Sequence, residues 1–336
     1  MNKIKLLSEE LAKKIAAGEV IERPFSVVKE LVENSIDAGA TKIKVELSKG
    51  GKRLIKVFDN GEGMTKEDAR LAFYRHSTSK ISNESDLKRI RTLGFRGEAL
   101  PSIAAVSKVI LMTRSKDEPT GTLLELEAGK EIRFLDCAHP PGTTVEVREL
   151  FYNLPARKKF MRSEQTELNL IIKYLTQLAL GYPSLQFTLF NNGRLIFSYT
   201  KTNSLRERIN QIYGSSLLRQ LLEINFEEDR LHLGGFFSRP PHGRPNKIFQ
   251  FFFVNKRPVR DKIMSSAVNQ AYSSLLEKDV FPVVFLFLNL PYEDVDVNVH
   301  PTKAEVRFNY SQKIYNSIYN VLKKELSRVV EAKSIE

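Results

Sequence analysis

The chain has 336 residues, a length that predicts two domains of ordinary size. Hydrophobic residues make up 42% of it and charged residues 27%, which is typical of a globular protein in water, and no apolar run is long enough to span a bilayer. The formal net charge of +12 favours a polyanionic partner such as nucleic acid, although a solvated basic surface explains the charge equally well.

Two helices are predicted first, over residues 8–18 and 24–38. Pro24 suits the first position of the second helix, where its missing N–H costs nothing, and Gly39 suits a left-handed cap at the end. The second helix is therefore the better defined of the two.

The predicted second helix carries polar residues beside an apolar stripe. Glu30, Asn34 and Asp37 fall together on the flank of this stripe, so we expect them to border the core. Lys29 and Glu33 point further round, and we expect them to be ordinary surface residues. A carboxylate and an amide at positions i and i+4 project from one helix face.

A β-hairpin is predicted after this helix. Residues 41–47 and 53–59 alternate apolar and polar side chains, and Gly50 and Gly51 supply the turn between them. Asp59 has the inward parity of the second strand. Because a buried carboxylate without a partner is costly, the protein or a ligand must offer donors to it.

The next segment combines a short helix, a polar stretch and a glycine-rich loop. Thr65 can cap a helix that ends near residue 75. The polar residues 76–85 lead to Gly94–Leu100, which opens a helix ending near Val106. A polar segment beside a glycine hinge is typical of a lid over a ligand site.

The remaining elements indicate an α+β protein of two units, with helices packed on one side of the first sheet. In the first unit we expect strands over residues 109–113, 123–127, 143–147, 185–190 and 195–199 and a helix over 164–180. Next come a helix over residues 204–212, strands over 231–237, 248–254 and 283–290, and helices over 262–276 and 312–332. We place the boundary near 210–220, which gives domains 1–215 and 216–336.

The start of the sequence and its cysteine content indicate a protein that works inside the cell. Residues 1–7 pass quickly into charged residues without the apolar core of a signal peptide, so we expect a cytoplasmic location. Cys137 is the single cysteine, which excludes an internal disulfide and zinc sites of paired cysteines. We interpret it as structural.

Glu30 and Asn34 have two interpretations. A carboxylate at the edge of a core can activate water, and an amide oxygen one turn away can ligate Mg²⁺. The alternative is a surface Glu and a helix-terminal Asn, which is the commoner meaning of such a pair in isolation.

Asp59 and the glycines around it also have two interpretations. Asp59 can accept a hydrogen bond from the exocyclic amine of adenine, while Gly61 and Gly63 let the base lie against the backbone. Consecutive amides in Gly94–Leu100 can bind phosphates. The alternatives are a plain turn and a glycine-rich connector, and the P-loop pattern is absent from the sequence.

Taken together, these motifs closely resemble those of the GHKL ATPases. The blocks that carry this resemblance are Glu30-x-x-x-Asn34, Asp59-x-Gly61-x-Gly63, Gly94–Leu100 and Gly142-Thr143-Thr144. Three further blocks resemble the N-terminal ATPase region of the MutL family of DNA mismatch repair proteins: Ile15–Pro24, Phe151–Arg157 and Val297–Lys303. The resemblance covers nearly the whole chain. It implies a GHKL-type (Bergerat) α/β sandwich followed by a ribosomal-protein-type α/β transducer domain.

The resemblance implies ATP and Mg²⁺ as cofactors and assigns roles to individual residues. Glu30 would be the general base, Asn34 the Mg²⁺ ligand, and Asp59 the adenine-binding residue with Thr143 assisting. Lys303 would reach the γ-phosphate from the second domain, although by itself it reads as a solvated lysine. The other implied nucleotide contacts are Ala38, Gly61, Gly63, Met64, Thr78, Ser79, Lys80, Gly94, Phe95, Arg96, Gly97, Glu98, Ala99 and Leu100.

The implied function is a slow Mg²⁺-dependent ATPase of DNA mismatch repair. ATP would order the lid, drive pairing of N-terminal regions into a homodimer and control DNA binding. The implied partners are single- or double-stranded DNA, the mismatch-recognition protein MutS, and downstream nuclease or helicase factors. One alternative is a DNA-binding scaffold in which ATP is only a conformational ligand. Another GHKL ATPase, such as a topoisomerase subunit, is disfavoured by residues 151–157 and 300–303.

Members of this family continue through a linker into a C-terminal dimerisation domain that sometimes carries a nuclease. Nothing after Ala332 resembles such a domain. We therefore expect the chain to be the N-terminal part of a longer protein, and we assign no nuclease activity to it.

Basic residues surround the predicted strand over residues 249–254. They are Arg239, Arg244, Lys247, Lys256, Arg257, Arg260 and Lys262. Phe251 and Phe253 favour core packing over base stacking. Arg257 and Arg260 flank Pro258 in a turn, and with the family resemblance we expect them to contact DNA phosphates without reading sequence.

Overall fold

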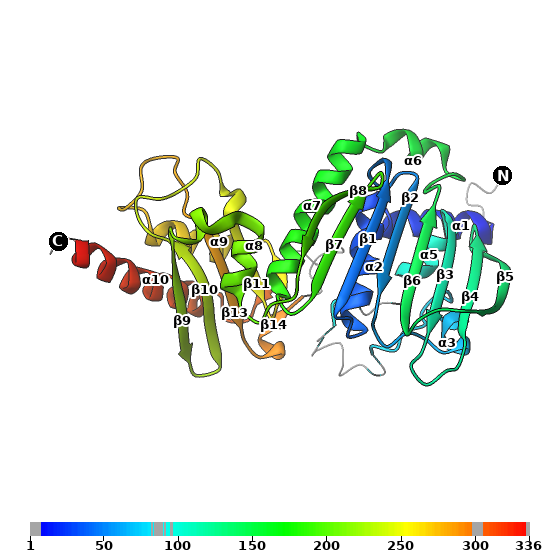
Figure 1. Cartoon of the computed structure of the whole chain (residues 1–336). Coiled ribbons are helices and arrows are strands. Elements are labelled where there is room, and N and C mark those ends of the chain that lie inside the picture. Colours follow the sequence, from blue (N-terminus) through cyan, green and yellow to red (C-terminus); the bar gives the residue numbers. More distant parts are fainter. Residues whose placement is uncertain are drawn as a thin grey trace, which may run out of the picture. The chain divides into compact units, whose positions relative to one another are not determined.

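The computed structural model describes residues 8–81, 83, 90, 92–94, 97–297 and 305–333. It divides into two compact units, each with its own sheet (Figure 1). The first comprises residues 1–82, 92–179 and 184–202, and the second comprises residues 83–91, 180–183 and 203–336. This division precedes the expected boundary after residue 215, because α8 (Leu205–Leu218) packs on the second sheet through Ile209 and Leu217.

The first unit is built on an eight-stranded sheet of order β5-β4-β3-β6-β2-β1-β7-β8. Its strands are β1 (Lys42–Ser48), β2 (Leu54–Asp59), β3 (Lys108–Arg114), β4 (Gly121–Glu127), β5 (Lys130–Cys137), β6 (Gly142–Arg148), β7 (Gln186–Asn191) and β8 (Arg194–Tyr199). Neighbouring strands run antiparallel, except that β1 and β7 are parallel.

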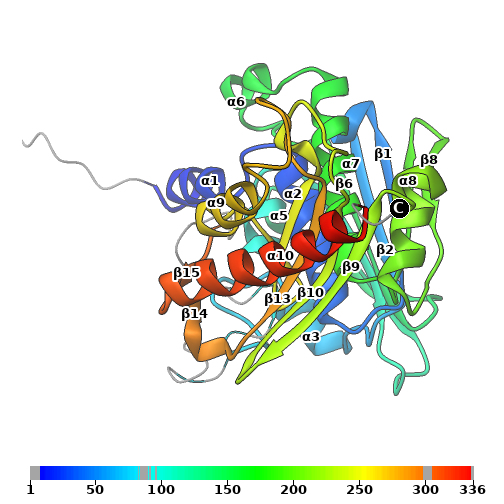
Figure 2. The ribbon, with the colours of Figure 1, turned by 90° about the vertical axis from the view of Figure 1, so that its left-hand side faces the viewer.

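Helices cover one face of this sheet. Figure 2 shows α1 (Glu9–Val20), α2 (Pro24–Asp37) and α5 (Ala99–Ala105) on that side. The long helix α7 (Glu164–Gly181) packs beside α2, where the rings of Phe25 and Tyr174 meet edge to face at 5.4 Å. The short helices are α3 (Lys66–Leu71) and α6 (Pro155–Phe160). The predicted α+β arrangement of the first unit is confirmed.

Local chemistry explains the elements that carry the polar residues of interest. Pro24 begins α2, and Gly39 follows it with a φ of 68°. In β2 the inward positions Ile55 and Val57 are buried, and Asp59 continues this parity. Thr65 caps α3 by accepting from the Asp68 N–H, but α3 ends at Leu71 rather than near residue 75.

The second unit has a five-stranded sheet of order β12-β11-β13-β10-β9. Its strands are β9 (Leu221–Glu228), β10 (Leu231–Ser238), β11 (Gln250–Val254), β12 (Arg257–Val259) and β13 (Val284–Asn289). Helices α9 (Lys262–Ala271) and α10 (Ser311–Lys333) cover one face (Figure 2), and β14 (Val295–Asp296) pairs with β15 (Arg307–Phe308).

Alternate side chains of the second sheet point to opposite faces and pack in two separate hydrophobic cores. Phe252 and Leu286 pack towards α9 and α10, whereas Phe251, Phe253 and Phe285 pack in the cluster that contains α8. The interpretation of Phe251 and Phe253 as core residues is confirmed, because they are only 5% and 0% exposed. The second sheet is thus a two-sided α/β layer.

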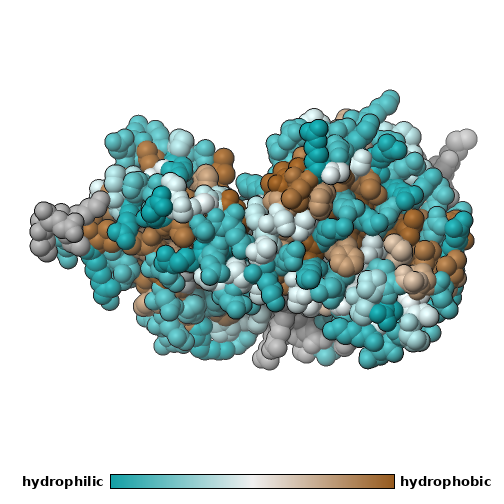
Figure 3. Space-filling model, viewed as in Figure 1, coloured by the Kyte–Doolittle hydropathy of each residue, from teal (hydrophilic) through white to brown (hydrophobic). Residues whose placement is uncertain are grey.

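Hydrophilic residues dominate the face of the molecule that Figure 3 shows. Within the described part of the chain, no helix is long and apolar enough to cross a membrane.

Candidate functional site

Helix α2 presents Glu30, Asn34 and Asp37 along one flank, as the sequence predicts. The Glu30 side chain is 20% exposed, and its Oε1 lies 3.2 Å from Lys29 Nζ. The Asn34 Oδ1 accepts a hydrogen bond of 2.8 Å from Lys80 Nζ. Glu30 and Asn34 therefore border the core while remaining partly exposed, whereas the Asp37 side chain is almost completely buried.

The expectation that Lys29 and Glu33 are ordinary surface residues is wrong. They are 8% and 3% exposed, and Lys29 donates to Glu33 Oε2 over 3.0 Å. The Tyr174 hydroxyl donates to Glu33 Oε1 over 2.6 Å, because α7 packs against this side of α2. Burial opposes the charge on Lys29, but the carboxylates of Glu33 and Glu30 raise its pKa above the ordinary value.

Asp59 lies at the end of β2 and is 5% exposed. Its Oδ2 accepts from the Ser35 hydroxyl over 2.7 Å, and its Oδ1 accepts from the Gly61 N–H over 2.9 Å. Burial raises the pKa of this carboxyl group, and the two hydrogen bonds offset part of that rise. The expectation of a buried acid supplied with donors is confirmed. Ser35 was missed because sequence spacing does not show that α2 brings it to the end of β2.

Threonine hydroxyls extend the polar lining beside Asp59. Thr143 pairs with Asp59 across the β2–β6 ladder, and its hydroxyl lies 2.9 Å from that of Thr113. The Thr113 oxygen also accepts from the Met64 N–H over 3.0 Å. Strands β2, β3 and β6 therefore contribute Asp59, Thr113 and Thr143 to one polar corner of the first unit. The sequence predicts Thr143 and Met64 as part of the site, but not Thr113.

The glycines of this corner allow backbone to pack on backbone. A Cβ on Gly61 would lie 2.7 Å from the Ala38 carbonyl oxygen, and one on Gly63 would lie 2.0 Å from that of Arg114. Gly63 also has a φ of 71°, which side-chain-bearing residues rarely adopt. The structure thus brings Ala38, Gly61, Gly63 and Met64 together around Asp59.

The glycine-rich loop starts next to Asn34. The Leu93 and Gly94 N–H groups donate to Asp37 over 2.8 and 2.9 Å. A Cβ on Gly97, where φ is 64°, would lie 2.5 Å from the Ser77 carbonyl oxygen. Residues 77–80 and the start of this loop therefore lie side by side near the end of α2.

The other predicted contacts divide between described and undescribed residues. The Thr78 hydroxyl accepts from the Lys80 N–H over 3.2 Å. Glu98 occupies the N-cap position of α5, and Ala99 and Leu100 are the first two residues of that helix. Ser79 follows Thr78 in the same segment. The predicted contacts Phe95, Arg96 and Lys303 lie outside the described residues.

The donor set fits a magnesium ion that a nucleotide brings with it. Among the residues that the structure describes, no group of three or more His, Cys, Asp or Glu side chains is arranged to hold a metal. One amide oxygen from Asn34 would leave the other positions to phosphate oxygens and water, which is how Mg²⁺ commonly binds beside nucleotides.

The two predicted DNA contacts differ in exposure. Arg257 in β12 is 7% exposed, which argues against direct contact with a phosphate. Arg260 is exposed just after that strand. The turn before β12 carries positive φ angles at Asn255 and Lys256, and Lys256 is exposed as well.

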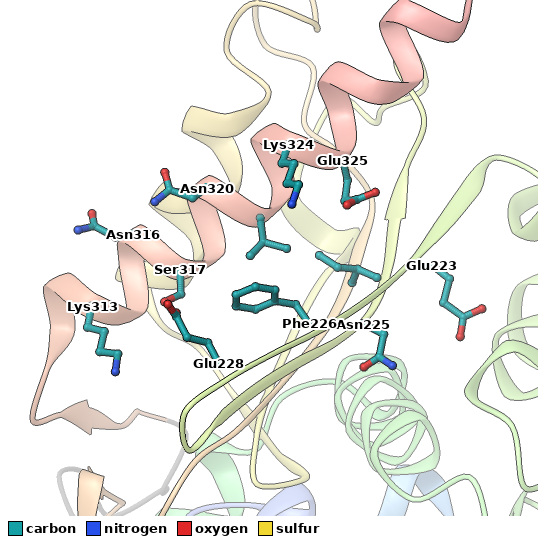
Figure 4. Close-up of a pocket in the computed structure, with 12 residues that line it drawn as sticks. Glu223, Asn225, Phe226, Glu228, Lys313, Asn316, Ser317, Asn320, Lys324 and Glu325 are labelled. Atoms are coloured by element: carbon teal, nitrogen blue, oxygen red, sulfur yellow. The ribbon is translucent and has the colours of Figure 1, made fainter.

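A separate groove of about 710 Å³ lies in the second unit between β9 and α10 (Figure 4). Its apolar lining residues include Ile224, Phe226 and Val321. Several charged residues on its rim already pair with neighbours: Glu223 with Arg206, Lys313 with Asp229, and Glu325 with Arg328. We assign no ligand to this groove.

Comparisons with known proteins identify the family of this chain. Residues 21–150 match the family "Histidine kinase-, DNA gyrase B-, and HSP90-like ATPase", and residues 209–327 match "DNA mismatch repair protein, C-terminal domain". The MutL protein of Solibacter usitatus is 44% identical over 97% of this chain and 54% of its own length. That of Syntrophotalea carbinolica is 47% identical over 97% of this chain and 52% of its own length. The chain thus spans about half the length of these relatives.

Solved structures give the same result. The ATPase domain of Aquifex aeolicus MutL complexed with ADP is 36% identical, has a TM-score of 0.61, and aligns over 81% of this chain and 93% of its own. The N-terminal domain of a DNA repair protein is 29% identical, with a TM-score of 0.80 and coverage of 94% and 98%. The chain therefore belongs to the MutL family of DNA mismatch repair proteins, as its N-terminal region, with a GHKL-type ATPase fold followed by a transducer domain.

Proposed function

We propose that this chain binds ATP with Mg²⁺ and hydrolyses it slowly as part of DNA mismatch repair. The observation that carries the proposal is that α2, which bears Glu30 and Asn34 one turn apart, contacts the buried Asp59 through Ser35, the residue after Asn34. A relative whose ATPase domain was solved with ADP supports the choice of nucleotide.

Asp59 is the proposed adenine-binding residue. Ser35 and Gly61 fix its two oxygens, each of which keeps acceptor capacity for the exocyclic amine of the base. Gly61 and Gly63 let the backbone pack closely beside Asp59, and Thr143, which pairs with Asp59 across the β2–β6 ladder, would assist through its hydroxyl. A site built to accept from an amine discriminates against bases that lack one.

Asn34 is the proposed metal ligand of the nucleotide site, and the loop over residues 94–100 is its proposed phosphate-binding segment. Asn34 Oδ1 would be the protein ligand of Mg²⁺, while the loop amides before α5 would face the phosphates. The bound metal would neutralise charge on the phosphate oxygens. Thr78, Ser79 and Lys80 would contact the nucleotide from the neighbouring segment, and Lys303 would reach its γ-phosphate.

Glu30 is the proposed general base, which would take a proton from the attacking water. The Lys29 ammonium holds the Glu30 carboxylate at 3.2 Å and is itself anchored by Glu33. Because Lys29 is buried and lies against Glu30, it orients the Glu30 carboxylate. Positioned general bases contribute roughly 10²- to 10⁴-fold in rate.

The wider role is proposed from family membership. ATP binding would order the segments beside the site, pair two N-terminal regions and promote DNA binding inside the cell, in concert with a mismatch-recognition protein and with nuclease or helicase factors. The two relatives from Solibacter usitatus and Syntrophotalea carbinolica are named DNA mismatch repair proteins.

For DNA, the exposed Arg260 is the favoured phosphate contact, whereas the burial of Arg257 makes it a supporting residue. Arg260→Glu should weaken binding at every sequence and flatten the dependence of affinity on salt. Arg328→Glu on α10 is the control, and an unchanged slope in Arg260→Glu would remove this residue from the proposal.

The test of the ATPase assignment is Glu30→Ala. This variant should bind ATP as the wild type does but lose at least about a hundredfold in turnover. Glu67→Ala, which removes an exposed carboxylate of α3, should hydrolyse ATP normally. Hydrolysis by Glu30→Ala at the wild-type rate would contradict the assignment of the base.

A further inference from the structure

The Asp37 carboxylate joins the end of α2 to two segments that are distant from it in sequence, at Lys80 and at Leu93 and Gly94. Its side chain is 6% exposed, and its Oδ2 lies 2.6 Å from Lys80 Nζ. The same carboxylate accepts from the N–H groups of Leu93 and Gly94 over 2.8 and 2.9 Å. One carboxylate at the end of α2 therefore holds the start of the glycine-rich loop and the lysine that precedes it.

Lys80 makes a second contact through the same nitrogen. Its Nζ donates to Asn34 Oδ1 over 2.8 Å, and the side chain is 20% exposed. An ammonium group is a compact cation with donors only, so it satisfies oxygens in the way a metal ion does. The cationic group of Lys80 thus contacts the amide oxygen that the proposed function gives to Mg²⁺.

Gly94 lies tightly against this pair. A Cβ there would come within 3.1 Å of Lys80 Nζ and 3.4 Å of Asn34 Oδ1. The first residue of the loop is therefore positioned by Asp37 at the place where the lysine and the amide meet.

We propose that Asp37 is a positioning residue of the nucleotide site, and that Lys80, held by Asp37, stands in the place of the divalent cation until nucleotide binds. This inference rests on the proposed function and deepens it. When magnesium nucleotide binds, Asn34 exchanges an ammonium for the metal, and Lys80 becomes available to the phosphates. Asp37 retains the amides of Leu93 and Gly94 throughout, so that the loop stays beside Asn34.

The first experiment measures amide hydrogen exchange at Leu93 and Gly94 by NMR in the protein without nucleotide. In Asp37→Asn, the side chain has a single acceptor oxygen and an NH₂ group that faces a donor. Exchange at these amides should accelerate at least about tenfold. Asp37→Glu keeps the charge and both acceptor oxygens. Its exchange rates at Leu93 and Gly94 should therefore lie between those of the wild type and of Asp37→Asn.

Asp136→Asn is the matched control for this experiment. It breaks another Asp–Lys pair of the first unit, the exposed contact between Asp136 and Lys66 at 2.5 Å. Exchange at Leu93 and Gly94 should keep its wild-type rate in this control. Wild-type exchange in Asp37→Asn would overturn the positioning role.

The second experiment uses Mn²⁺ alone, without nucleotide, and follows the side-chain NH₂ signal of Asn34. In Lys80→Met, the Asp37 carboxylate and Asn34 oxygen are both released to a cation that prefers oxygen ligands. Mn²⁺ should broaden the Asn34 signal at concentrations that leave the wild type and the Lys66→Met control sharp. Equal broadening in the wild type would show that Lys80 does not occupy the cation's place.

The two hypotheses fail in different ways. Absence of ADP binding by the wild type would contradict the proposed function, but both experiments above are read without nucleotide. If ADP binds and Lys80→Met shows no enhanced Mn²⁺ contact, the proposed function stands and this inference is overturned.

Discussion

Tyr174 donates its hydroxyl hydrogen to Glu33 over 2.6 Å, which joins α7 to the helix that carries Glu30. Glu33 in turn accepts from Lys29 over 3.0 Å, and Lys29 lies 3.2 Å from Glu30. The carboxylate proposed as the base is thus linked to another helix through the polar contacts of the buried Lys29 and Glu33.

Tyr174→Phe should destabilise the protein through this chain. The variant keeps the ring that packs on Phe25 but leaves a buried Glu33 oxygen without its donor, a loss of about 1 to 3 kcal/mol. Denaturant unfolding measures the change. Tyr310→Phe, at a position 64% exposed, is the control and should be neutral. Equal stability of Tyr174→Phe and wild type would mean that the hydroxyl contributes nothing.

Lys29 should give the protein an alkaline stability limit. Its folded-state pKa is raised, so the folded protein keeps this proton at pH values where the unfolded chain has released it. Its stabilisation is therefore complete below the ordinary lysine pKa of about 10.4 and declines as the pH rises through the folded-state pKa.

Lys29→Met tests this linkage. At neutral pH it should cost about 3 to 5 kcal/mol, because the buried Glu33 loses its cation. Unfolding free energies measured from about pH 9 to about pH 11 should fall more steeply in wild type than in the variant. Lys66→Met, which removes an exposed ammonium, is the control, and parallel curves for wild type and Lys29→Met would contradict the account.

Asp59→Asn should separate nucleotide binding from stability. An amide oxygen can still accept from Gly61, its NH₂ can donate to Ser35, and the Ser35 hydroxyl can turn to the Leu31 carbonyl at 3.1 Å. The fold is therefore kept. Since burial raises the pKa of Asp59, ionisation costs the wild type stability at neutral pH, and this cost is relieved as the pH falls.

The binding side of this prediction is measured by calorimetry. The amide would present its NH₂ group to the adenine amine, so ADP affinity should fall at least about tenfold. Asp136→Asn should bind as wild type does. Unchanged ADP affinity in Asp59→Asn would exclude Asp59 as the adenine contact.

Gly63→Ala should be costlier than Gly39→Ala. Both glycines have positive φ, 71° and 68°, so both substitutions carry a conformational cost of about 1 to 2 kcal/mol. A Cβ at Gly39 meets nothing within 4 Å, whereas one at Gly63 would lie 2.0 Å from a carbonyl oxygen. The difference in thermal stability between the two variants measures the cost of bringing a Cβ at residue 63 close to the Arg114 carbonyl oxygen. Equal losses of stability in the two variants would show that this contact has no cost.

Local patterns were sufficient for the elements that position the site. Pro24 and Gly39 delimit α2, and period-two alternation identifies the β1–β2 hairpin with Asp59 on its inner face. The sequence motif also identified the family. These features depend on neighbours within a few residues, so no knowledge of tertiary packing was needed.

Contacts between distant segments were not predictable in this way. Lys29 and Glu33 are buried because Tyr174, 141 residues after Glu33, packs over them. Strand β5 was missed because it is an edge strand whose Ile132 and Leu135 are exposed, which removes the alternation. The link from Asp37 to Gly94 likewise spans 57 residues.

The most direct test of the nucleotide site is an NMR titration of glycine-labelled protein with ATP and Mg²⁺. The account predicts shifts of the amide signals of Gly61, Gly63, Gly94 and Gly97, while Gly193 and Gly214 stay in place. Shifts confined to the control glycines, or no shift at saturating ATP, would contradict the claim that ATP binds at this corner of the first unit.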